Sequence, residues 1–308
     1  MNPRTSRLAI PRGASASSSD QIDPSDMFLS IVMPAHNEGR TIVSSIESLL
    51  RTAIPCPFEL LVVDDGSTDN TPHLLRSIDD PRLAVYRHPS NKGKGAAVLT
   101  GFEHASGTHI LVFDADSEYS PTDIPNLVRP VLSGRASVVY GARLFGNHTA
   151  YGSFKYALGN KLLTLAANVL FDSYVSDLHT CLKLLPRPLV GELILTETGF
   201  GLDTEMTGEL LRRSIRPYEV PVSYVARTHV EGKKIGWKDG VACLRILLTV
   251  RTRGRISLET TVLSKYAAPS HGAPAFLDLA DLEAESESLP SRANGLSEPA
   301  LDQAATTF

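Results

Sequence analysis

The stretch Thr108 to Pro121, THILVFDADSEYSP, decides how the rest of the chain is interpreted. Its apolar part, Ile110 to Phe113, ends in two aspartates one residue apart, Asp114 and Asp116, and Glu118 follows. An apolar run this short and rich in β-branched residues favours a buried strand over a helix. The three acids are therefore expected at the carboxyl end of a strand.

This position suits a metal site. Ligands in open α/β sheets bind beyond the carboxyl ends of the strands. Side chains at i and i+2 point the same way in an ideal strand, and the turn can bring Glu118 to Asp114 and Asp116 around one hard cation. We expect Mg²⁺ or Mn²⁺, shared with substrate phosphates. Because DxD triplets are common, a plain acidic turn is the alternative.

Composition limits the class of protein. The chain has 308 residues, 42% of them hydrophobic, which is enough for one large α/β domain with tails or for two small domains. A net charge of −4 argues against nucleic acid as a general partner. Three widely spaced cysteines without a CxxC pattern favour a reducing, cytoplasmic environment.

No signal-peptide core and no run of about 18 apolar residues occurs, so no membrane span is expected, although the protein can still lie on a bilayer.

Apolar runs alternate with helical patterns along the chain. Repeated strand–loop–helix units predict a mostly parallel α/β sheet with helices on both faces. Strands are predicted at 28–33, 59–63, 83–86, 110–113, 137–141 and 218–226, and helices at 41–51, 69–78, 154–171 and 200–213, with another from the NKGKG motif to about 104 and a last folded element at 236–255.

The two ends of the chain have a different composition. Residues 1–26 are rich in Ser, Pro and Ala and are predicted to be a disordered arm. Residues 257–308 are small, polar and acidic and are predicted to be a flexible tail. A single folded domain is expected between them, at 27–256.

Three predicted strands end in polar loops at one sheet edge: PAHNE, DDGSTD and DADSE. A nucleotide needs one carboxylate for its ribose hydroxyls, a short loop for its base and a metal between its phosphates. We assign the ribose or base contact to Asp65, with Glu38 nearby. The alternative role for acids in this loop is helix capping. Capping explains Asp69, but it does not explain the two adjacent acids, Asp64 and Asp65, at the end of a strand. Further candidate contacts in these loops are Pro34, Ala35, Asn37 and Ala115.

The NKGKGAAV motif permits another interpretation. Gly93 and Gly95 precede a helix, whose N-terminus attracts anions. The motif lacks the third glycine of a dinucleotide fingerprint and the GK[ST] of a P-loop, so it is a weak oxidoreductase signal. Lys92, Gly93 and Lys94 remain candidates for diphosphate contact, while the glycines allow close helix packing.

Taken in order, PAHNE, VVDDGSTDNT, NKGKGAAV and FDADSEYSP resemble the inverting family 2 glycosyltransferases of GT-A fold. The later motifs VVYGARLFG, VSDLHTCLKLLPR, GFGLDTEM and RTHVEGKKIGWKDG are similar to those of dolichyl- or polyprenyl-phosphate mannose and glucose synthases. The resemblance covers Phe28 to Arg255. It implies a nucleotide-binding half at 27–120 and an acceptor half at 121–256.

The resemblance also implies a reaction. A hexose would pass with inversion from GDP-mannose or UDP-glucose to a polyprenyl (dolichyl-type) phosphate. A divalent cation would stabilise charge on the departing diphosphate. The acceptor phosphate is already ionised, so no strong general base is needed. A soluble acceptor or glycan, and a non-catalytic nucleotide-sugar binding module, are the alternatives.

Cations must hold the acceptor phosphate in line. By resemblance, the candidates are Arg143, Lys155, Arg227 and Lys233. Asp116 is the candidate catalytic metal ligand. Three roles are open for Asp177: it orients the acceptor, it acts as a base, or it has only a structural role as a helix cap. The chain departs from the family pattern at Lys155 and Gly159 and in the Leu-His-Thr-Cys sequence after Asp177.

Two segments suit peripheral contact with the cytoplasmic face of a membrane. Phe154–Phe171 and Val241–Val250 are amphipathic or largely apolar, and Arg251, Arg253 and Arg255 follow the second. Each basic residue near an anionic surface contributes about 1 kcal/mol. The alternative is that both helices belong to the core.

Overall fold

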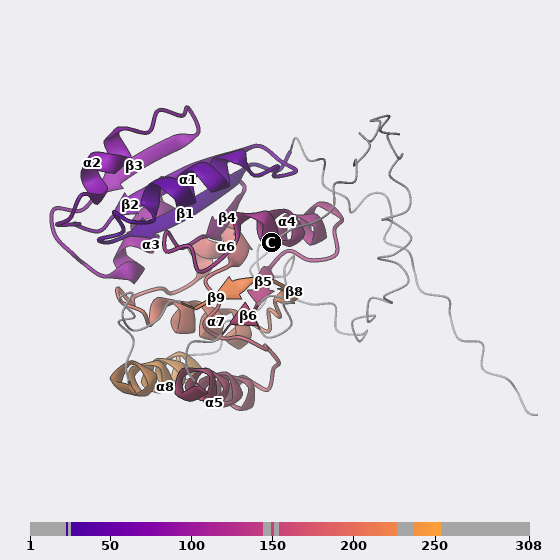
Figure 1. Cartoon of the computed structure of the whole chain (residues 1–308). Helices are drawn as coiled ribbons and strands as arrows, with labels where there is room; N and C mark the ends of the chain where they lie inside the picture. The colour runs from indigo at the N-terminus through magenta and orange to yellow at the C-terminus, as the bar shows by residue number, and fades with distance from the viewer. Residues whose placement is uncertain (1–22, 24–25, 144–148, 151–153, 227–236, 254–308) are drawn as a thin grey trace, which may run out of the picture. The chain divides into compact units, whose positions relative to one another are not determined.

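The computed structural model describes residues 23, 26–143, 149–150, 154–226 and 237–253. In this part of the chain the centre is a seven-stranded sheet of order β3-β2-β1-β4-β7-β5-β8 (Figure 1). Its pairs are parallel except where β7 runs antiparallel to β4 and β5. The strands are β1 (Leu29–Ala35), β2 (Phe58–Asp64), β3 (Leu83–Arg87), β4 (His109–Val112), β5 (Val139–Ala142), β7 (Lys183–Pro186) and β8 (Tyr218–Pro221); β6 (Thr149–Ala150) and β9 (Tyr224–Val225) form a small second sheet. The predicted mostly parallel α/β sheet is confirmed.

Helices cover both faces of this sheet. They are α1 (Ile42–Arg51), α2 (Thr71–Arg76), α3 (Lys94–His104), the 3-10 turn η1 (Pro121–Asp123), α4 (Ile124–Leu132), α5 (Phe154–Phe171), α6 (Arg187–Glu192), α7 (Leu202–Arg212) and α8 (Trp237–Thr252). Alternate side chains of β1 enter different cores, as the two-residue period of a strand requires. Ile31 and Met33 belong to a core that includes residues of α1 and α4. Val32 belongs to a second core, with residues of α6 and α7, and lies directly against Gly101 of α3.

Three sequence expectations need correction. The loop expected from Pro34 begins only at His36, because Pro34 and Ala35 continue β1 in register with Val63 and Asp64 of β2. The strand expected at 218–226 is divided into β8 and β9. The strand β7 and the helices α4 and α6 were not predicted. For β7 the reason is that the charged Lys183 interrupts the apolar run that would mark a strand.

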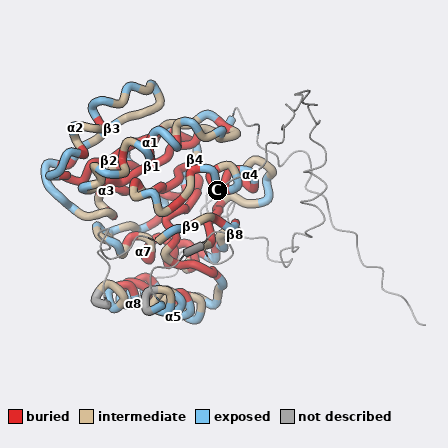
Figure 2. Tube along the Cα trace, viewed as in Figure 1, coloured by how far each residue is buried: buried red, intermediate tan, exposed pale blue. Residues whose placement is uncertain are grey.

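A second layer of helices packs beyond the sheet. Helix α8 lies against α7 and α5, and Leu247 joins Ala167 and Leu178 in a small separate core. Gly208 of α7 brings the helices close, since a Cβ there would lie 3.2 Å from Val250 Cγ1. Figure 2 shows the resulting division of these helices into buried and exposed faces. The inner faces of α5 and α8 therefore belong to the core, which is the alternative to membrane contact that the sequence allowed for these two helices.

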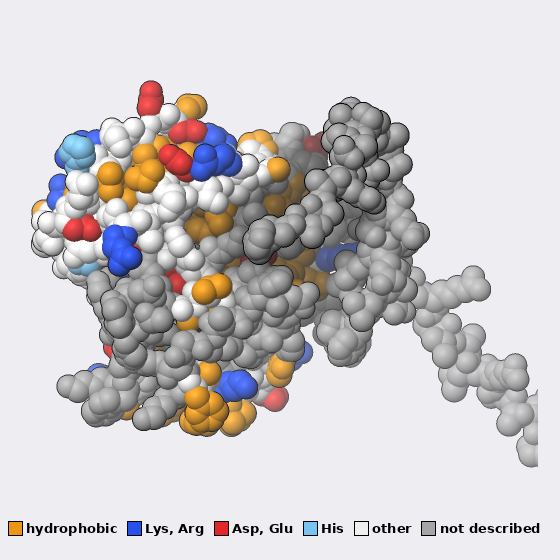
Figure 3. Space-filling view, viewed as in Figure 1, with side chains coloured by type: hydrophobic (Ala, Val, Ile, Leu, Met, Phe, Trp, Pro, Cys, Tyr) orange, Lys and Arg blue, Asp and Glu red, His pale blue; other side chains and the backbone are white. Residues whose placement is uncertain are grey.

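The outer faces of α5 and α8 form what we call the apolar ridge. Its members are Phe154, Leu158, Leu162, Leu165 and Val169 of α5 and Val241, Leu244 and Leu248 of α8, each at least 41% exposed. Hydrophobic side chains are visible along the edge where these helices lie (Figure 3). Contiguous exposed apolar surface on this scale usually marks a contact with another molecule or a membrane.

No described helix is long and apolar enough to cross a bilayer. The cysteines Cys56, Cys181 and Cys243 are buried and unpaired. The predicted arm and tail, residues 1–26 and 257–308, lie almost entirely outside the described residues, so the domain boundaries remain predictions.

Candidate active site

The PAHNE and DDGSTD loops are tied together at the sheet edge. Asn37 has a φ of 57°, and its side-chain Oδ1 accepts hydrogen bonds from the backbone N–H groups of Thr68 and Asp69 at 2.8 and 3.3 Å. Its own N–H donates to Ser67 Oγ at 2.9 Å. Glu38 accepts a hydrogen bond from the Thr41 hydroxyl at 2.9 Å. The two loops expected to face a nucleotide therefore form one unit.

Asp65 fixes the next loop along the edge. Its carboxylate accepts bonds from the N–H groups of Lys92 and Gly93 at 2.9 and 2.8 Å and lies 2.7 Å from His88 Nδ1. It is only 2% exposed. The structure thus brings the carboxylate assigned to the ribose beside Lys92 and Gly93, whose loop it holds in place by direct bonds.

Gly93 and Gly95, at the start of α3, allow another segment of the chain to lie close against this helix. A Cβ on Gly93 would lie 2.4 Å from the Thr198 carbonyl oxygen, and one on Gly95 would lie 2.5 Å from that of Glu197. The Ala96 N–H, in the first turn of α3, donates to Thr198 O at 2.9 Å. The close-packing interpretation is therefore confirmed, and the helix N-terminus is covered by residues 197–199.

At the DADSE turn, Asp114 belongs to an ion-pair group. Lys94 Nζ lies 2.8 Å from Asp114 Oδ2 and 3.7 Å from Asp203 Oδ2. Lys183, fully buried, lies 3.3 Å from Asp203 Oδ1. Burial alone would lower the pKa of Lys94, but the negative charges of Asp114 and Asp203 outweigh it and raise that pKa well above the ordinary value. Lys94 is therefore a fixed positive charge at the end of β4.

The three predicted metal ligands are not gathered at one point. Asp114 pairs with Lys94, Asp116 Oδ1 accepts the Glu118 N–H at 3.0 Å, and Glu118 Oε2 accepts the Tyr224 hydroxyl at 2.8 Å. Within the described residues no group of three or more His, Cys, Asp or Glu side chains could hold a metal ion. Mg²⁺ commonly takes only one or two carboxylates and completes its shell with phosphate oxygens, so the donor chemistry of this turn still fits such an ion.

Arg143 and Asp177 form a buried bidentate pair. Arg143 Nε and Nη2 donate to the two oxygens of Asp177 at 2.5 and 2.6 Å, and the guanidinium lies 4.9 Å from the centre of the Tyr224 ring. Asn160 of α5 donates a third bond to Asp177 at 3.0 Å. Burial would raise the pKa of Asp177, but Arg143 outweighs it and holds that pKa below the ordinary value. This geometry suits an orienting partner of Arg143, and the carboxylate contacts side chains rather than helix N–H groups.

His179 extends this chain of bonds with a defined tautomer. Asn160 Nδ2 donates to Asp177, so Asn160 Oδ1 must accept from His179 Nδ1, 2.7 Å away. His179 Nε2 lies 3.0 Å from the Thr204 hydroxyl. Burial, with the positive charge of Lys183, lowers the pKa of His179 to about 4. The ring is therefore neutral, with its proton on Nδ1, and accepts the hydroxyl proton at Nε2.

This histidine makes stability depend on pH. Burial also lowers the pKa of His109 to about 4. Between about pH 6.5 and pH 4 the unfolded chain binds these protons and the folded chain does not, so the free energy of unfolding falls as pH falls through this window. Denaturant unfolding of His179→Gln across this range is expected to show a shallower decline than the wild type. An identical decline would contradict the buried neutral ring.

An open pocket of about 390 Å³ lies beside the DADSE turn. Ser44, Ser45 and Ser48 of α1 line it together with Phe113, Ser117, Glu118, Tyr119, Ser120, Pro121, Ser223, Tyr224 and Val225. Hydroxyl and aromatic groups dominate, and Glu118 is the single charged lining residue. Such a lining suits a neutral hydroxylated group better than a phosphate.

Some sequence candidates are not placed, and some residues were missed. Arg227 and Lys233 lie outside the described residues, and so does the side chain of Lys155. Sequence reasoning assigned no role to Lys183, His179, Asn160 or Tyr224, and it noted Asp203 only as part of a helix. Their common signal is a polar side chain within or beside an apolar run, visible for Lys183 in KLLP.

Comparison with known proteins agrees with this geometry. A low-salt glycan biosynthesis hexosyltransferase of Haloferax volcanii is 31% identical over 68% of this chain and 51% of its own length. An undecaprenyl-phosphate 4-deoxy-4-formamido-L-arabinose transferase of Pseudomonas fluorescens is 29% identical over 67% of this chain and 59% of its own length. This chain thus spans little more than half of these relatives.

Solved structures support the same fold. Glucosyl-3-phosphoglycerate synthase of Mycobacterium tuberculosis, in complex with uridine diphosphate, superposes with a TM-score of 0.59 and 21% identity, over 79% of this chain and 86% of that chain. This likeness shows the expected GT-A type of α/β fold. The model of the family described as "Glycosyl transferase family 2" matches residues 30–193, more than half of the chain, and the protein therefore belongs to glycosyl transferase family 2.

Proposed function

We propose that the protein transfers a hexose, with inversion, from GDP-mannose or UDP-glucose to a polyprenyl (dolichyl-type) phosphate at a membrane surface. The observation that carries this proposal is the double role of α5. Its outer face carries the exposed Leu162 and Leu165, and Asn160, on the same helix, donates to the Asp177 of the Arg143 pair. A lipid lying along α5 would bring its phosphate toward Arg143.

The donor would bind at the edge formed by β1, β2 and β4. The PAHNE and DDGSTD loops are joined there through Asn37, and Lys94 supplies a partly buried positive charge at the end of β4. Asp116, with Glu118 beside it, would hold Mg²⁺ or Mn²⁺ together with diphosphate oxygens. When bound, the cation stabilises the negative charge that develops on the departing diphosphate. The synthase of similar fold was solved with Mn²⁺ and uridine diphosphate.

The acceptor side fits a phosphate nucleophile. A phosphate is ionised at neutral pH, so its attack needs orientation rather than a strong base. Asp177 is engaged by Arg143 and Asn160 and therefore orients the guanidinium instead of removing a proton. By its name, the Pseudomonas relative acts with undecaprenyl phosphate, which belongs to the same class of acceptor.

The apolar ridge would rest on the bilayer. Exposed Lys161 of α5 and Arg245 of α8 lie on the helices that carry it, a combination that suits an anionic lipid surface. The arginines in the last turn of α8 and after it do not add to this surface in the expected way. Arg253 turns inward to Glu205 and Glu209, Arg251 donates to Leu170 O at 2.8 Å, and Arg255 lies outside the described residues.

A paired substitution on the ridge tests the proposal. Leu162 and Leu165 are 58% and 57% exposed, so Leu162→Glu with Leu165→Glu is expected to leave folding intact. An anionic lipid surface repels the two added negative charges. The variant should therefore no longer sediment with phosphatidylglycerol vesicles, and it should no longer transfer sugar to polyprenyl phosphate contained in those vesicles. Calorimetric binding of UDP or GDP should be unchanged. Val85→Glu, at a 43% exposed apolar residue of β3, is the control and should behave as the wild type.

Transfer to polyprenyl phosphate at the wild-type rate by the doubly substituted protein would contradict the lipid-facing role of α5. Transfer to 3-phosphoglycerate in place of the lipid would favour a soluble acceptor.

A further inference from the structure

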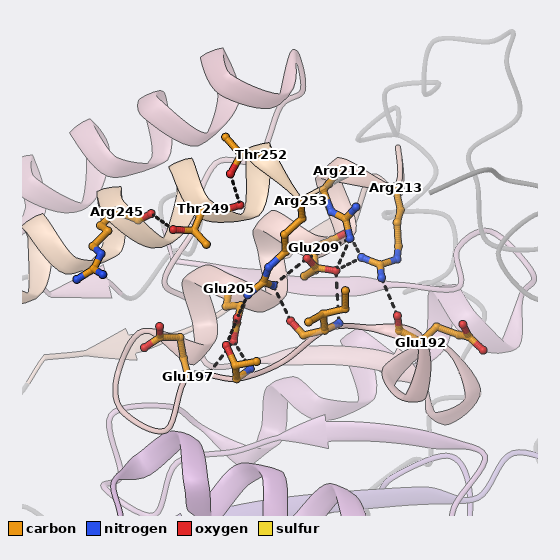
Figure 4. Close-up of polar contacts among 12 residues, drawn as sticks. Glu192, Glu197, Glu205, Glu209, Arg212, Arg213, Arg245, Thr249, Thr252 and Arg253 are labelled. Atoms are coloured by element: carbon orange, nitrogen blue, oxygen red, sulfur yellow. Dashed lines mark hydrogen bonds and ion pairs between the residues drawn. The ribbon is translucent and has the colours of Figure 1, made fainter. Parts of the chain in front are cut away.

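Arg253, one residue beyond α8, reaches into the protein and joins three partners. Its Nη2 donates to Glu205 Oε1 at 2.7 Å, and its Nη1 donates to Glu209 Oε1 at 3.0 Å and to the Ile194 carbonyl oxygen at 2.8 Å. Figure 4 shows the guanidinium reaching Glu205 and Glu209. The side chain is 20% exposed, and its bonds to the two carboxylates are partly buried.

The two glutamates also accept bonds from other residues. Glu205 is 1% exposed, and its carboxylate accepts the N–H groups of Thr196 and Glu197 at 2.6 and 2.8 Å and the Thr196 hydroxyl at 2.8 Å. Glu209 is fully buried and also accepts bonds from Arg212 and Arg213. Burial alone would raise the pKa of Glu209, but these arginines and Arg253 hold it below the ordinary value. Glu209 is therefore a fixed negative charge facing Arg253, and Glu205 faces the same guanidinium at 2.7 Å.

The segment held in this way, residues 194–199, has one apolar contact with the core, through the partly buried Leu195. None of its six residues is fully buried, and Ile194 is 45% exposed. Apart from Leu195, its position therefore depends on polar bonds, chiefly those from Glu205 and Arg253. Mobile segments are characteristically those with few buried apolar contacts, so loss of these bonds should release it.

The same segment covers the start of α3. Thr198 O accepts the Ala96 N–H at 2.9 Å, and the absence of side chains at Gly93 and Gly95 lets residues 197–199 lie directly on the helix. Helix α3 begins with Lys94, whose Nζ lies 2.8 Å from Asp114. An unbroken series of contacts thus runs from the end of α8, through Arg253 and Glu205, to the proposed nucleotide-sugar site.

We propose that Arg253 is a positioning residue for that site. Together with Glu205 it fixes residues 194–199 against the first turn of α3 and so holds Lys94 beside Asp114. The inference rests on the proposed donor site, and it adds a residue at the end of α8 that bonds to neither the DADSE turn nor the Arg143 pair. Removing it should weaken nucleotide binding without removing any group that contacts the nucleotide.

Arg251 provides a matched control. It lies on the last turn of the same helix and carries the same charge, but its Nε donates to Leu170 O of α5 and no contact joins it to residues 194–199. Arg251→Met and Arg253→Met therefore remove one arginine each from the same helix end. A role limited to stabilising α8 predicts the same outcome for both variants.

The experiment compares the full chain with Arg253→Met, Arg251→Met and Arg253→Lys. Calorimetry measures the Kd of UDP and of GDP with Mg²⁺, and hydrogen–deuterium exchange follows peptides covering 93–98 and 194–199. Arg253→Met should raise the Kd about tenfold and speed exchange in both peptides. Arg251→Met should match the wild type. Arg253→Lys keeps the charge but lacks the planar fork and should fall between them.

Wild-type Kd values in Arg253→Met, or the same change in Arg251→Met, would overturn the inference. If Arg253→Met does not fold, Arg253→Lys decides, and a wild-type Kd in that variant overturns it as well. A wild type that binds neither nucleotide would refute the proposed function instead. In that case the exchange data would still show whether Arg253 fixes residues 194–199.

Discussion

Asp116→Asn is expected to reduce turnover by a factor on the order of 10³. The substitution keeps the size of the side chain and an oxygen that can accept the Glu118 N–H, so the turn should stay folded. It removes the negative charge that would hold the divalent cation against the diphosphate. The loss should appear in kcat, measured with saturating nucleotide sugar and Mn²⁺ or Mg²⁺.

Asp79→Asn is the matched control for this prediction. Asp79 is exposed and far from β4 in the sequence, and its substitution should leave kcat unchanged. Raising the Mn²⁺ concentration should recover part of the activity of Asp116→Asn, because weaker metal binding is offset by mass action. Activity of Asp116→Asn close to that of the wild type would remove Asp116 from the metal site.

Asp177→Asn is expected to lower the free energy of unfolding by about 3–5 kcal/mol. Asp177 is fully buried and Arg143 only 12% exposed, so the substitution leaves a guanidinium in the interior without its counter-charge. For a domain of this size each kcal/mol corresponds to about 2–4 °C in Tm, so the transition should shift by roughly 6–20 °C. Scanning calorimetry measures this shift.

The exposed pair Arg51 and Glu47 is the control for this loss. Its side chains are 72% and 50% exposed, and Glu47→Gln should change stability by less than about 1 kcal/mol. Adding Arg143→Met to Asp177→Asn should restore part of the lost stability, since the unpaired charge is then removed. Equal Tm values for Asp177→Asn and the wild type would show that the buried pair does not stabilise the fold.

The sequence was most informative where one pattern determines local structure. The apolar run before Asp114 forms a strand that ends at the predicted edge, and the periodic pattern of α5 gave its bounds, Phe154–Phe171, without error. Helix α2 is shorter than predicted, at Thr71–Arg76, because Pro72 and neighbouring polar residues mark a start but no clear end.

The sequence was least informative where distant residues meet. Lys183 lies in the middle of the sheet because Asp203 and backbone carbonyls, contributed by another part of the chain, satisfy its ammonium group. No local pattern predicts such a partner, so β7 was missed. For the same reason Arg253 was expected at the surface, since its partners Glu205 and Glu209 lie more than forty positions earlier in the sequence.

The most direct test of the account is a transfer assay with radiolabelled donors. GDP-mannose and UDP-glucose are offered separately to the protein with membranes containing polyprenyl phosphate, with and without Mg²⁺, and the lipid is then extracted. The account predicts label in a lipid that mild acid cleaves, from one of the two donors and only with the cation present. Absence of lipid label from both donors, with nucleotide binding intact, would contradict it.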